Sequence, residues 1–188
     1  MGCGGEGMNV DWEGHGNVIV FTGVGKGKTT AALGLACRAV GHGRRAAFIH
    51  FTGPMRARLG DVCSTKELGA MVTMIAIESQ ASDKAYLDQF DETVATVEAA
   101  LDRAEGLLAG GEYQLLVLDD INPLLDQGLV EPSAVKGLIE TKPPSATMVF
   151  TGRCAPDYVV ELADIVTDFA EVKHPVRAGV APRKGIEY

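Results

Sequence analysis

A glycine-rich segment with two lysines and two threonines is the part of the sequence with the clearest chemistry. It reads Thr22-Gly23-Val24-Gly25-Lys26-Gly27-Lys28-Thr29-Thr30 and stands between an apolar run and a helical pattern, the setting of a phosphate-binding P-loop. Glycines let backbone N–H groups turn toward a phosphate, and a helix N-terminus adds partial positive charge. Lys28 can reach the β- and γ-phosphates, and the Thr29 hydroxyl can bind Mg²⁺. The segment predicts binding of a nucleoside triphosphate; the plainer alternative is a turn that only packs a helix on a sheet.

Two acids supply a candidate for the other half of the same site. Asp119 and Asp120 directly follow the apolar run Leu115-Leu116-Val117-Leu118, about ninety residues after the loop. Acids at the carboxyl edge of a parallel sheet point into the ligand crevice, where a carboxylate can hold Mg²⁺ directly or through water. The alternative is a turn in which the acids cap a helix. We predict that Asp119 or Asp120 is the metal partner, and the sequence does not separate them.

Short apolar runs alternate with helical patterns from residue 17 onward. We expect strands at residues 18–22, 45–51, 70–77, 113–118, 147–151 and 165–167, and helices at 28–40, 83–108, 132–140 and 158–162. This alternation predicts an α/β fold with a mostly parallel sheet and helices on both faces. The strands are apolar throughout, as strands buried on two sides are. Residues 17–188 are expected to form one domain, and residues 1–16, with six glycines, a flexible tail.

Composition narrows the class of partner. The chain has 188 residues, of which 46% are apolar, and 17 Lys and Arg stand against 25 Asp and Glu, a net charge of −8. An acidic balance argues against nucleic acid or an anionic membrane as the main partner. There is no apolar stretch long enough to span a bilayer and no signal-peptide pattern. Four scattered cysteines are typical of reduced cytosolic thiols, so we expect a cytoplasmic protein, with Cys37 buried in the first helix.

Several segments, taken in order, resemble the P-loop type of corrinoid adenosyltransferases, which act on cob(I)alamin or cob(I)yrinic acid a,c-diamide. The P-loop followed by Arg38-Ala39-Val40-Gly41-His42-Gly43 is one match, and that family tolerates a residue such as Thr22 in place of the first glycine. The other matches are Val117-Leu118-Asp119-Asp120 to its V-L-D-E, Thr151-Gly152-Arg153 to its T-G-R, Lys173-His174-Pro175 to its K-H-P, and Gly185-Ile186-Glu187-Tyr188 to its G-I-E-Y ending. The ordered set covers residues 17–188.

The resemblance implies a transfer reaction between MgATP and a corrinoid reduced to Co(I). Cobalt attacks C5′ of the ribose and triphosphate leaves, so Lys26, Lys28, the loop amides and Mg²⁺ would stabilise the leaving group. The cobalt is the nucleophile, so the protein supplies none. By the same resemblance Thr29 and Asp120 hold the metal, and Arg38 and Arg153 lie near the nucleotide. The phosphates would be held by Gly23, Val24, Gly25, Lys26, Gly27, Lys28, Thr29 and Thr30. A homodimer fits the family, and Co(I) requires an electron donor.

The segments expected at the corrinoid depart from the family pattern. Where much of the family has F-T-W-E-T-Q, this chain has Ile75-Ala76-Ile77-Glu78-Ser79-Gln80, so Ile75 and Ile77 replace two aromatics. A flat ring covers a macrocycle and expels an axial ligand more completely than a branched aliphatic side chain does. The family's Q-F-x-K reads His50-Phe51-Thr52-Gly53 here. His50 is either a cobalt ligand or, as we favour, a polar strand-end residue near the nucleotide.

We therefore expect a single P-loop NTPase domain with a RecA-like sheet that adenosylates a Co(I) corrinoid with MgATP. A divergent relative that binds or hydrolyses ATP as a regulatory protein is the alternative, and Ile75 and Ile77 are its support. A small-molecule kinase is a third candidate, with an acceptor lid drawn from Arg56, Arg58 and Lys66. The products distinguish the three: triphosphate, orthophosphate, or ADP with a phosphorylated acceptor.

Overall fold

A computed structural model describes residues 14–51, 72–77, 90–181, 183, 185 and 186, and of residues 72–77 and 90–93 it describes the backbone. The elements follow one another along the chain as strands and helices in near alternation. They are β1 (Val18–Thr22), α1 (Lys28–Gly41), β2 (Ala46–Phe51), β3 (Val72–Ile77), α3 (Phe90–Ala109), β4 (Leu115–Asp119), α4 (Asn122–Asp126), α5 (Pro132–Thr141), β5 (Thr147–Thr151), α6 (Asp157–Leu162), β6 (Ile165–Asp168) and the 3-10 helix η3 (Pro175–Ala178).

The strands form one sheet in the order β3-β2-β4-β5-β1-β6, and every neighbouring pair runs parallel. The expected parallel α/β fold is therefore confirmed. Parallel pairing puts the carboxyl ends of all strands at one edge. The register sets His50 beside Asp119 and Thr22 beside Asp168 there.

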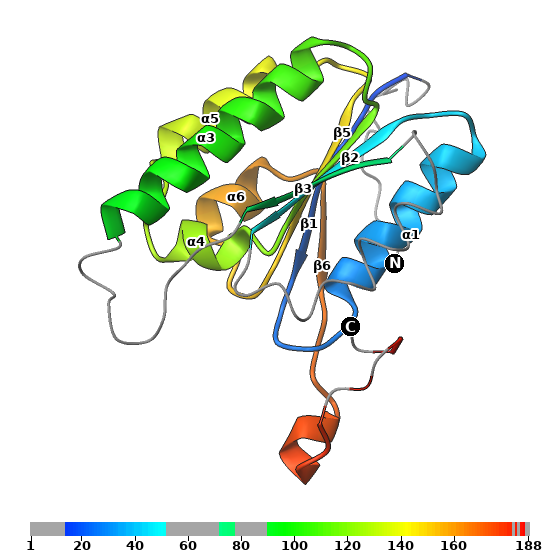
Figure 1. Cartoon of the computed structure of the whole chain (residues 1–188), viewed down its shortest axis with the longest axis vertical. Coiled ribbons are helices and arrows are strands. Elements are labelled where there is room, and N and C mark those ends of the chain that lie inside the picture. Colours follow the sequence, from blue (N-terminus) through cyan, green and yellow to red (C-terminus); the bar gives the residue numbers. More distant parts are fainter. Residues whose placement is uncertain (1–13, 52–71, 78–89, 182, 184, 187–188) are drawn as a thin grey trace, which may run out of the picture.

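Helices cover both faces of the sheet, and each face has its own apolar core. Figure 1 shows α1 on one face and α3, α4, α5 and α6 on the other. Ile19, Phe21 and Val117 point toward α1 and pack with its buried Ala32 and Ala36. The neighbouring residues along the same strands point to the larger core under the other helices, and they include Val18, Val20, Leu116, Leu118, Met148 and Phe150. This two-sided burial is why β1, β2, β4 and β5 lack a polar face. The expectation of buried strands was wrong for β6, which lies at the edge of the sheet and is exposed.

Helix α1 is anchored at both ends by backbone geometry. Gly27, its N-cap, has φ 110°, a left-handed conformation that glycine adopts without strain. At the other end the N–H groups of His42 and Gly43 donate to the carbonyls of Ala39 and Val40. The prediction for Cys37 was wrong: its side chain is exposed, because it points away from the sheet while its neighbour Ala36 packs against it.

The predicted secondary-structure elements agree with the structure in most places. All six predicted strands are present, but the two short helices α4 and η3 were not predicted. Helix α3 is described from Phe90, so its predicted start at residues 83–89 lies outside the described residues, as do residues 1–13 of the predicted tail. Among the described helices, none is both long and apolar enough to cross a membrane.

Candidate functional site

The predicted P-loop connects β1 to α1 at the carboxyl edge of the sheet. The Lys28 ammonium folds back over this loop: Nζ donates to the carbonyl oxygens of Gly23 at 2.6 Å and Gly25 at 2.7 Å. Lys28 and Thr29 are half-buried, whereas the side chains of Val24, Lys26 and Thr30 are exposed. The loop thus presents an ammonium and the first turn of α1 to one side, which is the arrangement that receives phosphate.

Two loop glycines are required by the segment that follows β6. Gly23 has φ 93°, and a Cβ placed there would collide with the Asp168 carboxylate. A Cβ on Gly25 would collide with the Phe169 carbonyl, which accepts a hydrogen bond from the Gly25 N–H at 2.6 Å. The loop therefore takes its shape from a segment more than 140 residues further along the chain.

Phe169 supports the loop from beneath and was missed by the sequence analysis. Its ring meets that of Phe21 edge to face with centroids 5.5 Å apart, and Lys28 Nζ lies 6.0 Å from its centroid. Its N–H donates to the Thr22 carbonyl at 2.9 Å. The one available signal was an aromatic residue two positions after the last predicted strand, which was expected to end at residue 167.

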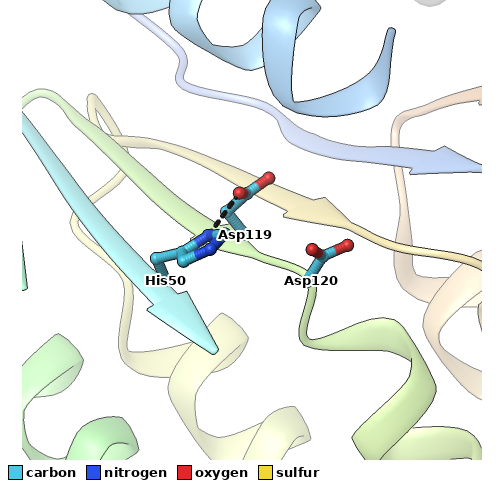
Figure 2. A group of neighbouring side chains, drawn as sticks. All are labelled: His50, Asp119 and Asp120. Atoms are coloured by element: carbon cyan, nitrogen blue, oxygen red, sulfur yellow. Dashed lines mark hydrogen bonds and ion pairs between the residues drawn. The ribbon is translucent and has the colours of Figure 1, made fainter. Parts of the chain in front are cut away.

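Asp119 is the polar centre of the site. Its carboxylate is fully buried. It accepts hydrogen bonds from the hydroxyls of Thr29 (3.0 Å) and Thr151 (2.5 Å), and Nδ1 of His50 lies 2.6 Å from its Oδ2 (Figure 2). The hydroxyl predicted to bind metal is thus held by an acid from β4, 90 positions along the chain. The other residues of this cluster stand at the ends of neighbouring strands: His50 on β2, Asp119 on β4 and Thr151 on β5.

Asp120 has a different environment from Asp119. It turns away from the strand with φ 59°, and its N–H donates to the Thr151 hydroxyl at 2.9 Å. The side chain is half-buried, and Figure 2 shows it beside the His50–Asp119 pair. Ligand atoms of His50, Asp119 and Asp120 lie within 4.8 Å of one another, close enough to share one cation. The structure thus separates the two acids: Asp119 orients hydroxyls, and Asp120 has the more open carboxylate.

The Lys28 ammonium lies among charges of both signs. Burial lowers the pKa of Lys28, and the Arg153 guanidinium lowers it further, while Asp120, Asp168 and Asp119 act in the opposite direction. Arg153 is exposed, follows β5 and lies close enough to Lys28 to lower its pKa. Like charges disfavour each other's ionised form, so an anion bound near both would favour the charged Lys28.

Some predicted residues lie elsewhere or are described only in part. Arg38 is ten residues along α1 from Lys28, about 15 Å at the rise of a helix, so the structure does not bring it to the loop. Ile75 and Ile77 are in β3, where their backbones pair with Ile49 and Phe51. Their side chains, and Arg56, Arg58 and Lys66 of the lid considered above, lie outside the described residues.

Comparison with known proteins agrees with this geometry. The family model described as ATP:corrinoid adenosyltransferase BtuR/CobO/CobP matches residues 14–188. This chain belongs to that family. A corrinoid adenosyltransferase of a Sinorhizobium species is 33% identical over an alignment of 183 positions that covers 92% of this chain and 80% of the relative. The corrinoid adenosyltransferase of Pseudomonas aeruginosa is 33% identical, covering 93% of this chain and 84% of the relative, and corrinoid adenosyltransferase CobA of Salmonella typhimurium is 33% identical, covering 94% and 87%.

A member of the ATP:corrinoid adenosyltransferase family is expected to bind two substrates, and the structure describes the residues predicted for them to different extents. The residues predicted to hold the nucleotide, from Gly23 to Thr29 with Asp119 and Asp120, are all described. Of the residues predicted to face the corrinoid, the structure describes His50 and the backbone of β3. His50 lies at the end of β2 and contacts Asp119, so its role beside the nucleotide or the corrinoid stays a prediction.

Proposed function

We propose that this protein transfers the 5′-deoxyadenosyl group of MgATP to a Co(I) corrinoid and releases triphosphate. The main support is the hydrogen bond from the Thr29 hydroxyl to the buried Asp119, in a loop that also carries the Lys28 ammonium. The chain belongs to the adenosyltransferase family. We place the reaction in the cytoplasm, where scattered thiols stay reduced. The corrinoid must arrive as Co(I), so an electron donor reduces it first.

The triphosphate would be held by the loop amides, Lys28 and Arg153. Lys28 Nζ donates to two loop carbonyls, and those donors can turn outward to phosphate oxygens. Arg153 supplies the second cation. As the C5′–O bond breaks, negative charge grows on the leaving triphosphate, and fixed cations and amides aimed at it stabilise the transition state more than the ground state.

A magnesium ion fits the oxygen donors at the end of β4. The Thr29 hydroxyl and the Asp120 carboxylate are hard oxygen ligands of the kind Mg²⁺ prefers, and Asp119 fixes the direction of the Thr29 hydroxyl. When bound, the ion would neutralise charge on the phosphate oxygens. The buried Asp119 acts as the orienting acid because its oxygens already accept from Thr29, Thr151 and His50.

The remaining task of the protein is to bring C5′ and cobalt together. Phe51 pairs with Ile77, so β3 and β2 end together at the edge that carries His50 and Asp119. A corrinoid bound beyond this edge would face the nucleotide across His50. A homodimer is proposed from the family resemblance alone, and light scattering tests it separately.

The deciding experiment is anaerobic incubation of the full chain with ATP, Mg²⁺ and chemically reduced cobalamin. We expect the Co(I) spectrum to convert to that of alkyl-Co(III), with one triphosphate released per cobalt alkylated. Lys28→Ala is the inactive control. Orthophosphate without a spectral change would replace this proposal with an ATP-hydrolysing regulatory relative, and ADP with a phosphorylated acceptor would indicate a kinase.

A further inference from the structure

A pocket of about 560 Å³ lies at the opposite edge of the sheet from the P-loop. Its floor is formed by the starts of three strands, through Ile19, Leu115 and Thr147, and its wall by Leu35 and Ala39 of α1. Both Ile19 and Leu115 belong to the apolar core beneath α1. The volume is within the range of small-molecule sites, which are typically apolar with a few polar groups that fix orientation.

Three side chains that are or can become cationic line the same pocket. Arg38 and His42 come from the end of α1, and Arg44 from the turn that follows. All three are exposed. Within the residues that the structure describes, none of the three side chains has a hydrogen bond or an ion pair. The chain has eight more acids than bases, so this gathering of unpaired cations is against its average charge.

Arg45, the residue after Arg44, differs from it because its side chain has partners within the protein. Arg45 Nη1 pairs with Glu112 at 3.1 Å, and its guanidinium lies 5.0 Å from the centre of the Tyr113 ring. Arg45 is thus used within the protein. Cations at the end of a helix also stabilise its dipole, and that would account for Arg38 and His42 but not for an apolar floor between them and Arg44.

This pocket is separate from the nucleotide site. Arg38 is about 15 Å along α1 from Lys28, and Ile19 and Leu115 stand near the amino ends of strands whose carboxyl ends carry the P-loop and Asp119. A triphosphate on Lys28 would therefore leave the pocket open.

We propose that this pocket binds a small organic anion, with its phosphate or carboxylate group between Arg38 and Arg44 and its apolar body over Ile19, Leu35 and Leu115. Arginine suits both kinds of anionic group because its planar fork can donate two parallel hydrogen bonds. The apolar floor adds affinity that a bare anion cannot gain. The proposal is independent of the corrinoid reaction.

The probe is 1-naphthyl phosphate, titrated by calorimetry into the full chain saturated with MgATP so that the P-loop is occupied. We expect a Kd on the order of 0.1 mM, a value suited to a fragment of that size. Inorganic phosphate lacks the apolar ring and 1-naphthol lacks the anionic group, so each should bind at least tenfold more weakly. Equal binding of inorganic phosphate would overturn the proposal. So would binding of 1-naphthyl phosphate to the nucleotide-free protein that is absent from the MgATP-saturated protein.

Variants locate the site. Arg38→Gln with Arg44→Gln should weaken 1-naphthyl phosphate at least tenfold, whereas Arg103→Gln, which removes an exposed arginine of α3, should leave its affinity unchanged. Amide chemical shifts of the unaltered protein give a second reading that needs no variant. They should move at Ile19, Leu35 and Leu115 and not at Gly23 and Gly25. Binding that survives the double substitution, or shifts confined to the loop, would refute the assignment.

Discussion

The imidazole Nδ1 of His50 lies 2.6 Å from Oδ2 of Asp119, the same carboxylate that receives the Thr29 hydroxyl. The register of the sheet sets this contact, because His50 on β2 pairs with Asp119 on β4. One buried acid therefore connects the strand next to the proposed corrinoid side with the first turn of the nucleotide helix. A change at His50 should reach ATP binding through Asp119.

Replacing His50 tests that connection. A hydrogen bond to a charged group contributes about 1.5–3 kcal/mol, so His50→Leu should lower the free energy of unfolding by roughly that amount and weaken ATP binding. His50→Gln can still donate to Asp119 from its amide, and it should stay within about 1 kcal/mol of the unaltered protein. Urea unfolding and ATP titration measure both. Equal stability of all three proteins would mean that the contact contributes nothing.

The two neighbouring acids should respond differently to the same substitution. Asp119→Asn puts an amide donor among three donors and should cost about 2 kcal/mol of unfolding free energy. Asp120→Asn keeps the left-handed conformation, which asparagine tolerates, so stability should change by less than about 0.5 kcal/mol. ATP affinity in Mg²⁺ should nevertheless fall at least tenfold for Asp120→Asn. In EDTA its affinity should match the unaltered protein, and an equal loss there would show that Asp120 does not act through the metal.

Lys28→Ala should abolish ATP binding without unfolding the protein. Any residual adenosylation should fall by about 10²–10³ in rate, because a preorganised cation at the developing charge is lost. The pKa of Lys28 is lowered in the fold, so folding disfavours its charged form. That cost is full below the lowered pKa, decreases as pH rises above it and is gone above the ordinary pKa of 10.5. At neutral pH, removing the ammonium relieves this cost and loses the hydrogen bonds to Gly23 and Gly25, so the free energy of unfolding should change little. Lys136→Ala, an exposed lysine of α5, is the control for ATP titration and should bind normally.

The fold was predictable because its signals are local and repeated. Each buried strand is a short apolar run, and the loop's glycines and lysines stand directly between β1 and α1. Parallel strands put their carboxyl ends at one edge, so the contact of Thr29 with Asp119 at the end of β4 followed from the topology. The sequence did not distinguish Asp119 from Asp120. Their different environments depend on the direction in which the chain leaves β4, where Asp120 has φ 59°.

Other features could not be read from local patterns. The support of Gly25 by Phe169 joins residues 144 positions apart, and no nearby pattern encodes it. Arg38 was placed near the nucleotide because a motif preserves order along the chain, whereas three turns of helix carry the side chain to the far edge of the sheet. The helix α4 is only five residues long, too short for a periodic pattern.

Phe169 should matter for both stability and nucleotide affinity. Phe169→Ala removes a half-buried ring that packs on Phe21 and lies under the loop, so we expect a loss of about 1–2 kcal/mol in unfolding free energy. ATP affinity should fall several-fold because the loop loses its backing. Phe169→Leu keeps much of the apolar area and should recover part of both losses. An alanine variant that binds ATP as tightly as the unaltered protein would show that the backbone contacts of residue 169 suffice.

Ile77→Trp addresses the corrinoid half. Ile77 ends β3 beside Phe51, and it stands where the resembling family has an aromatic residue. An aromatic contact contributes about 0.5–1.5 kcal/mol beyond area, so a ring that favours four-coordinate cobalt should raise the adenosylation rate about 2- to 10-fold. Ile77→Leu, similar in volume but without a ring, should leave the rate unchanged. Electron paramagnetic resonance of bound Co(II) cobalamin should show a larger four-coordinate fraction in the tryptophan variant. An unchanged or lower rate would mean that this chain removes the axial ligand by residues other than the one at position 77.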